Sequence, residues 1–167
     1  PDTGGTAKRI FNSHGWMTVF VRLATERDFD AIVELSRQNC EETKQGDTFS
    51  PRRVREVLNQ YLASANPTIF VVDDNREVIA FLSATMNLFD HRDGFFTCQK
   101  VLFVTARKRG SRAAILLMKE LIRWSEQLGA VEVCGGNDNE FQSDRTAKFL
   151  EHFGFERVGY AMTKRLV

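Results

Sequence analysis

The stretch VLFVTARKRGSRAAILLMKELIRWSEQL, residues 101–128, decides the fold of this chain. It begins with an apolar run, continues through a basic turn with one glycine, and ends in a segment whose apolar residues recur at helical spacing. This order predicts a strand followed directly by the N-terminus of a helix. The first turn of a helix has unpaired backbone N–H groups and the positive end of the helix dipole, which favour a phosphate or pyrophosphate group.

The basic turn by itself supports two interpretations. Gly110 lets the backbone approach a ligand closely. Four cations surround this glycine: Arg107, Lys108, Arg109 and Arg112. The turn lacks the G-x-x-x-x-G-K-S/T pattern of a Walker loop and the three glycines of the dinucleotide fingerprint. A phosphate site and a merely solvated connection therefore both stay open.

Length and composition restrict the class of protein. A chain of 167 residues fits one domain, and a net charge of +1 gives no general attraction to nucleic acid or membranes. No apolar run is long enough to cross a bilayer. The three cysteines have no metal-ligand spacing, so we expect no metal and reduced thiols in a cytoplasmic protein. We divide the chain into residues 1–16, which are a leader, an upstream extension or a native arm that packs on the body, and residues 17–167, a single domain.

Apolar periodicity and turn signals predict the remaining elements. We expect strands at residues 18–23, 68–72, 78–88, 95–104 and 131–134, and one or two more within residues 155–167. We expect helices at residues 25–42, 50–66, 113–128 and 145–152. This order indicates an α/β (α+β) fold with a mixed central sheet of about six to seven strands and helices on both faces. The strand–helix–strand unit from Val101 to Cys134 should be parallel, with a ligand site beyond the carboxyl end of its first strand.

This arrangement resembles the GNAT superfamily of acyl-CoA-dependent N-acyltransferases, which have a three-layer fold. The pyrophosphate motif of that family has glutamine or arginine, two free positions, glycine, one free position, and glycine or alanine. Arg107 and Gly110 match it, whereas Arg112 departs from the last position. The Arg-Gly-Ser-Arg-Ala-Ala form of the turn resembles a subgroup found in phages and prophages. Further matches near the C-terminus are Asn137, Asn139, Ala147, Phe149, Leu150, Glu151, Gly154 and Phe155.

The resemblance implies both a donor and a chemistry. Acetyl-CoA or a close relative would be the acyl donor, and a primary amine would attack its thioester directly in a ternary complex. The pyrophosphate of coenzyme A would lie on the turn, and its pantetheine arm would pair with the backbone of the fourth strand. The implied cofactor-binding residues are Phe103, Val104, Thr105, Arg107, Arg109, Gly110, Ser111, Arg112, Ala113 and Asn139.

The sequence departs from the family at the positions of the general acid and the general base. Many relatives have tyrosine at the position of Leu150, which cannot donate a proton. Tyr160 and His152 are the nearest candidate catalytic residues, although a strand edge and a helix end also explain them. Residues 97–100, where relatives often have a catalytic glutamate, contain no carboxylate. The Asp and His side chains of residues 89–94 could face the acceptor.

A covalent route through cysteine is a further alternative. Cys98 and Cys134 fall on neighbouring predicted strands, so an acyl-cysteine intermediate is conceivable. No histidine is obviously placed to activate either thiol, and buried cysteines without a chemical role are more common.

An N-acyltransferase is the function that we favour. The alternative is a catalytically weak or inactive GNAT-like module that binds coenzyme A or a partner. The missing tyrosine and glutamate favour that alternative, and the intact turn disfavours it. The acceptor would be a small molecule or a protein amine, bounded by residues 89–94 and 43–49. Nucleic acid and membrane partners are disfavoured, and a homodimer through the edge of the last strand stays open.

Overall fold

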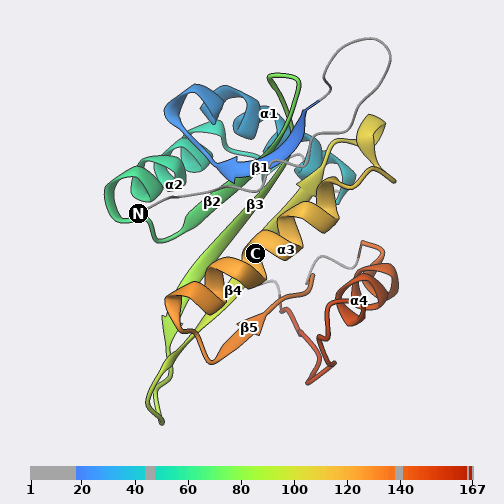
Figure 1. The fold of residues 1–167 in the computed structure, drawn as a ribbon. Coiled ribbons are helices and arrows are strands. Elements are labelled where there is room, and N and C mark those ends of the chain that lie inside the picture. Colours follow the sequence, from blue (N-terminus) through green and yellow to red (C-terminus); the bar gives the residue numbers. More distant parts are fainter. Residues whose placement is uncertain (1–17, 44–47, 138–140, 165, 167) are drawn as a thin grey trace.

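The computed structural model describes residues 18–43, 48–137, 141–164 and 166, and the expected leader at residues 1–16 lies outside these ranges. Strands and helices follow one another much as the sequence predicts (Figure 1). Their bounds are β1 (Val19–Leu23), α1 (Phe29–Glu42), α2 (Pro51–Ser64), β2 (Thr68–Asp74), β3 (Glu77–Leu88), β4 (Phe95–Val104), α3 (Ala113–Leu128), β5 (Glu132–Cys134) and α4 (Ser143–Glu151). None of the described helices is long and apolar enough to span a membrane.

The sheet is mixed and follows the strand order β1-β2-β3-β4-β5. Neighbouring strands from β1 to β4 are antiparallel, whereas β5 runs parallel to β4, as the strand–helix–strand pattern predicts. The pairing of β4 with β5 ends at Cys98 and Cys134. Beyond that point, residues 99–104 of β4 have no described strand on their β5 side, so this backbone edge is open.

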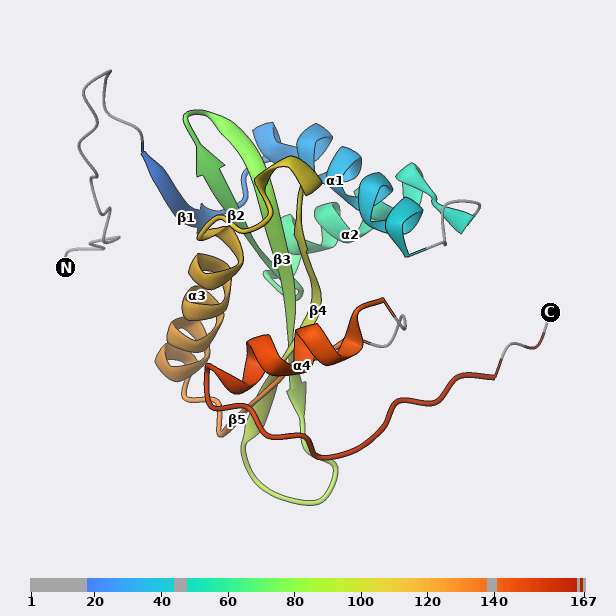
Figure 2. The ribbon, with the colours of Figure 1, turned by 90° about the vertical axis from the view of Figure 1, so that its right-hand side faces the viewer.

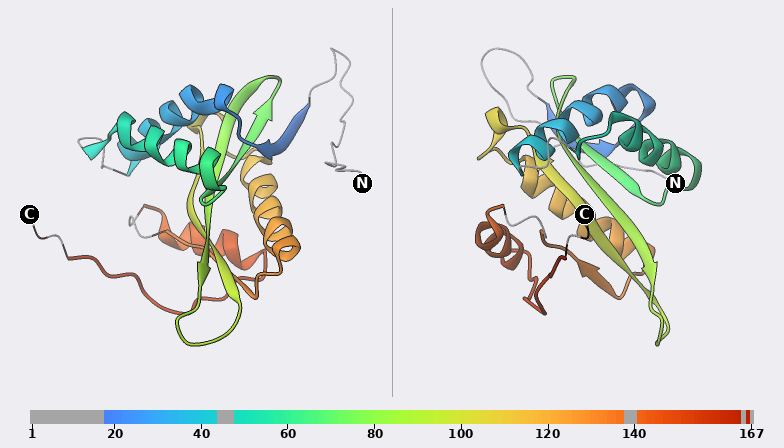
Figure 3. Two further views of the ribbon diagram at one scale, coloured as in Figure 1. Left: turned by 90° about the vertical axis from the view of Figure 1, so that its left-hand side faces the viewer. Right: turned by 180° about the vertical axis from the view of Figure 1, so that it is seen from behind.

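Helices cover both faces of the sheet, which confirms the expected three layers (Figure 2). Side chains of β2 alternate between the two layers: Phe70 and Val72 face α3 and α4, whereas Ile69 and Val71 face α1 and α2. This alternation explains why β2 is apolar over most of its length and buried along all of it. The end of the β3–β4 hairpin projects beyond the helices (Figure 3).

The prediction of six to seven strands is wrong, since the described sheet has five. Residues 155–164 form no strand. The alternating side chains Val158, Tyr160 and Met162 are 97%, 89% and 94% exposed. A strand requires a hydrogen-bonding neighbour as well as alternation, and this segment runs past α4 and away from the sheet (Figure 2).

Local signals set most of the element ends. The Ser50 side chain accepts a hydrogen bond from the Arg53 N–H at 3.3 Å, and Pro51 occupies the first position of α2. Gly129 ends α3 at a φ of 80°, in the left-handed conformation. The β2–β3 hairpin turns at Asn75 and Arg76, whose φ values of 54° and 70° suit a two-residue turn.

A buried hydroxyl ties α2 to the sheet and gives a first prediction. The Tyr61 hydroxyl donates to the carbonyl of Ala24 at 2.7 Å, and burial raises the pKa of this phenol. Tyr61→Phe leaves that carbonyl unpaired, so we expect the free energy of unfolding to fall by about 1 kcal/mol. Urea denaturation measures the change. An unchanged midpoint would mean that the hydroxyl contributes nothing to docking α2.

Candidate functional site

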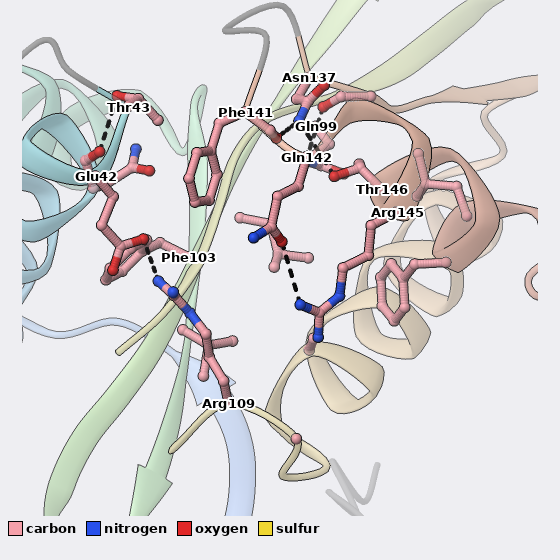
Figure 4. Close-up of a pocket in the computed structure, with 18 of the residues that line it drawn as sticks. Glu42, Thr43, Gln99, Phe103, Arg109, Asn137, Phe141, Gln142, Arg145 and Thr146 are labelled. Carbon is pink, nitrogen blue, oxygen red and sulfur yellow. Dashed lines mark hydrogen bonds and ion pairs between the residues drawn. The ribbon is translucent and has the colours of Figure 1, made fainter. Parts of the chain in front are cut away.

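A pocket of about 270 Å³ opens where β4 and β5 diverge (Figure 4). It lies between the last turn of α1, the basic turn before α3, and α4. The described lining residues are Asn39, Glu42, Thr43, Gln99, Leu102, Phe103, Val104, Lys108, Arg109, Gly110, Ser111, Ala114, Gly136, Asn137, Phe141, Gln142, Arg145, Thr146, Phe149 and Leu150.

The open edge of β4 forms one wall of this pocket. Leu102, Phe103 and Val104 line it, and their strand has no described neighbour on that side. Gln99 is the first residue after the paired region, and its side-chain nitrogen donates to the Gly136 carbonyl at 3.4 Å. Its side-chain oxygen is buried and has no hydrogen-bond partner among the described residues. An extended ligand with amide groups could therefore pair with this edge as a further strand does.

The basic turn presents backbone N–H groups at the end of the pocket. Residues 106–108 form a short 3₁₀ turn, and Gly110 follows at a φ of 80° with no atom within 4 Å of where a Cβ would stand. The N–H groups of Gly110, Arg112 and Ala114 donate to no other described residue. They lie at the positive end of the α3 dipole. Unpaired N–H groups at a helix N-terminus suit an anion, so the turn has the geometry of the site that the sequence predicts, while the ligand itself stays a prediction.

Most cations of the turn already have carboxylate partners. Arg107 pairs with Glu77 at the start of β3, and Lys108 pairs with Asp74 at 2.6 Å. Arg109 pairs with Glu42 at the end of α1. Arg112 is the one cation of the turn without a carboxylate partner in the described chain. Three of the four cations around Gly110 are therefore already engaged within the described chain.

The pocket brings together half of the predicted cofactor-binding residues. Those in its lining are Phe103, Val104, Arg109, Gly110 and Ser111.

The other five are not among the described lining residues. Thr105 is buried and its hydroxyl donates to the Gln38 side chain at 3.0 Å, while Ala113 is fully buried in the core beneath the turn. Arg107 and Arg112 are outside the lining, and Asn139 lies outside the described residues.

The two candidate catalytic residues do not reach the pocket. His152 lies at the end of α4, with Nδ1 2.6 Å from the Lys148 carbonyl, and Tyr160 is 89% exposed on the C-terminal segment. Leu150, at the position of the usual acid, does line the pocket. The loop at residues 89–94 lies at the tip of the β3–β4 hairpin, and none of its residues lines the pocket.

Two charged residues of the pocket were not singled out from the sequence. Glu42 comes from the last turn of α1, next to the segment expected to bound the acceptor. Arg145 comes from the first turn of α4, where its Nη1 donates to the Gln142 side chain at 3.2 Å. It makes no ion pair with a described residue. The sequence did offer a signal for both residues. Each is a charged residue near the end of a predicted helix that borders the predicted site.

The Cys134 thiol is less suited to nucleophilic chemistry than its place on β5 suggests. Cys98 and Cys134 lie on neighbouring strands, as predicted, and the structure makes them register partners on β4 and β5. Burial raises the pKa of the Cys134 thiol, and the neighbouring Cys98 and Glu132 raise it further. The reactive thiolate of Cys134 is therefore disfavoured, which argues against an acyl-cysteine route. Within the part of the chain that the structure describes, no group of three or more His, Cys, Asp or Glu residues could hold a metal ion.

Comparison with known proteins gives a family match and several similar folds. The family model described as the acetyltransferase (GNAT) family matches residues 29–155. A search of curated proteins found no match.

Three solved structures illustrate the likeness of fold, each at 16% identity. A transcriptional regulator from Bacillus halodurans C-125 has a TM-score of 0.76, over 89% of this chain and 99% of that one. Aminoglycoside N-acetyltransferase AAC(6')-Iy, solved in complex with CoA, has a TM-score of 0.75, over 93% of this chain and 98% of that one. An acetyltransferase from Trypanosoma brucei has a TM-score of 0.72, over 89% and 99%. At this identity the likeness shows the fold alone.

Proposed function

The chain belongs to the GNAT family of acetyltransferases, and on that premise we propose that it transfers an acetyl group from acetyl-CoA to a primary amine. The observation that carries the proposal is the pocket where unpaired N–H groups of Gly110, Arg112 and Ala114 adjoin an open strand edge. A ligand that fits both must have an anionic group at one end and an extended chain with amides beyond it. Coenzyme A has this form: a pyrophosphate followed by a pantetheine arm.

In the proposed complex the pyrophosphate accepts hydrogen bonds from the turn, and the pantetheine amides pair with β4 at Phe103 and Val104. The arm then leads toward Gln99, where β4 and β5 separate. Thr105 and Ala113 support this geometry from below, because each is buried and fixes one side of the turn. Arg107 holds the turn to β3 through Glu77.

The reaction needs little from side chains once both substrates are in place. The amine nitrogen attacks the thioester carbonyl carbon, the C–S bond breaks, and the amine loses a proton. An N–H group on the open edge of β4 can stabilise the oxyanion. Since Leu150 lines the pocket while His152 and Tyr160 do not, we assign both proton transfers to water, which accepts the proton that the amine loses and protonates the leaving thiolate. Positioning then supplies most of the acceleration.

One observation favours a second candidate function. Leu150 occupies the position of the usual acid, and residues 97–100 contain no carboxylate. A chain that binds coenzyme A without catalysing transfer would have this composition. The enzyme and the binding module would share the donor site, but only the enzyme would transfer the acetyl group.

The test begins with calorimetry of acetyl-CoA, with free CoA and ATP as controls. We expect micromolar affinity for acetyl-CoA and for free CoA. We expect no such affinity for ATP, because ATP has no pantetheine arm. Thiol release is then followed with a panel of primary amines. Binding with release supports the enzyme, binding without release supports the module, and absence of CoA binding rejects both.

Cations of the site that have no carboxylate partner among the described residues should strengthen the binding of CoA. We expect Arg112→Ala and Arg145→Ala each to weaken CoA binding by about three- to tenfold and to make the affinity less dependent on salt. Lys119→Ala is the matched control, because it removes one positive charge from an exposed position of α3, the helix that follows the turn. An equal effect in all three variants would indicate net charge alone rather than contacts with phosphate.

A further inference from the structure

One ion pair crosses the mouth of the pocket. Arg109 Nη2, on the basic turn, pairs with Glu42 Oε2, at the end of α1 (Figure 4). Their side chains are 36% and 25% exposed, so both remain accessible to a ligand. The guanidinium carbon of Arg109 lies 5.7 Å from the centroid of the Phe103 ring, on the strand that forms the pocket wall. The pair therefore joins the proposed donor site to the helix on its other side.

The negative charge of Glu42 is stabilised in the pocket by the Arg109 cation. Among the described residues that line the pocket it is the one carboxylate, while Lys108, Arg109 and Arg145 are cations. It lies in the last turn of α1, where the negative end of the helix dipole disfavours a second negative charge. Its neighbour Glu41 differs, since it pairs with Arg37 on the exposed side of the same helix.

We propose that Arg109 leaves Glu42 for the phosphates of coenzyme A, and that the freed Glu42 carboxylate then binds a positively charged group of the acceptor. This inference rests on the proposed function. It assigns Arg109 as the coupling residue between the two substrates and Glu42 as the specificity-determining residue for the acceptor.

Charge and geometry favour the exchange. A guanidinium pairs strongly with phosphate, and here the unpaired N–H groups of the turn hold that phosphate beside Arg109. Bound coenzyme A adds several negative charges to a lining that holds three cations and one carboxylate. The pocket consequently becomes acidic only after the donor has bound. A cation is then attracted to Glu42, whose former partner is engaged.

The chemistry of the acceptor follows from the same exchange. The nitrogen that attacks the thioester must be neutral and must lie near Gln99, where the strands separate. The group held by Glu42 must therefore be a second, positively charged one. The acceptor class is a primary amine with an additional cationic group.

The first test measures CoA affinity by calorimetry. Glu42→Gln removes the competitor for Arg109, so CoA should bind about three- to fivefold more tightly, the range of an exposed ion pair. Glu41→Gln is the matched control and should change nothing. In an Arg109→Ala background, Glu42→Gln should lose its effect, because the two residues act as one unit. Unchanged or weaker CoA binding in Glu42→Gln would overturn the exchange.

The second test titrates 1,5-diaminopentane into the protein with and without saturating CoA. We expect CoA to raise the affinity for the diamine about fivefold or more, and the diamine to raise the affinity for CoA equally. Glu42→Gln should abolish this coupling, and the uncharged 1,5-pentanediol should not show it. Diamine binding that is absent, or independent of CoA, would overturn the acceptor assignment. Failure of the proposed function looks different, since the wild-type protein would then not bind CoA at all.

Discussion

Replacing Gly110 with valine is expected to weaken CoA binding by about 100-fold or more while the fold persists. The loss follows from several hydrogen bonds to a charged group, each contributing about 1.5–3 kcal/mol. Gly110 has a φ of 80°, which a β-branched residue adopts only with strain. A side chain at this position meets no protein atom within 4 Å, so it would extend into the space that we assign to phosphate.

The chain contains a matched control for this substitution. Gly129 also has a φ of 80° and no atom within 4 Å of where a Cβ would stand, but it ends α3 and is not part of the pocket lining. Gly129→Val should therefore bring the same backbone strain, measured as a lower melting temperature, with unchanged CoA affinity. If both variants lose CoA equally, strain in α3 is responsible and the turn is not the phosphate site.

Periodicity predicted the fold wherever a segment is bounded by turns and has at least one face to bury. The β2–β3 hairpin, the long β4 and the amphipathic α3 all have both properties, and all are present. Residues 155–164 have alternation alone, and the structure leaves them outside the sheet. Alternation describes the two sides of a strand but does not supply the partner that must accept its hydrogen bonds.

The candidate site likewise has one part that contiguous residues determine and another that depends on residues far apart in the chain. The basic turn is local, because its strand, glycine and helix are contiguous, and the sequence was sufficient to predict this arrangement. The ion pairs that engage its cations are not local, since Glu42 lies 67 residues before Arg109 in the chain. No spacing rule links residues that only the packing of α1 against β4 brings together. The sequence therefore predicted the turn and its cations but not the ion pairs that engage three of them.

The largest effect on stability is expected at Asp28, which is only 5% exposed. Its carboxylate accepts hydrogen bonds from two nitrogens of Arg22, at 2.7 and 2.9 Å, and from the Thr25 N–H at 2.7 Å. The same Arg22 also pairs with Asp73 at 3.0 Å, so the network joins β1, β2 and the start of α1. Asp28→Asn removes the charge that Arg22 requires. We expect the free energy of unfolding at neutral pH to fall by about 2–4 kcal/mol, near the lower end of values for buried pairs because Arg22 is partly solvated.

The pH dependence of this loss identifies its cause. Burial alone would raise the pKa of Asp28, but the hydrogen bonds from Arg22 and Thr25 outweigh it and hold the pKa below its ordinary value. A depressed folded-state pKa means that the stabilisation is complete above the unfolded value of about 3.9 and disappears as pH falls through the folded value. Urea denaturation should thus show a constant gap between wild type and Asp28→Asn near neutral pH, which narrows below pH of about 4. Asp30→Asn is the control, because its carboxylate is 89% exposed and its pair with Arg55 lies on the surface. If the difference in free energy of unfolding between wild type and Asp28→Asn did not narrow in acid, altered packing would be the cause of the loss, since only the ionised carboxylate can hold Arg22.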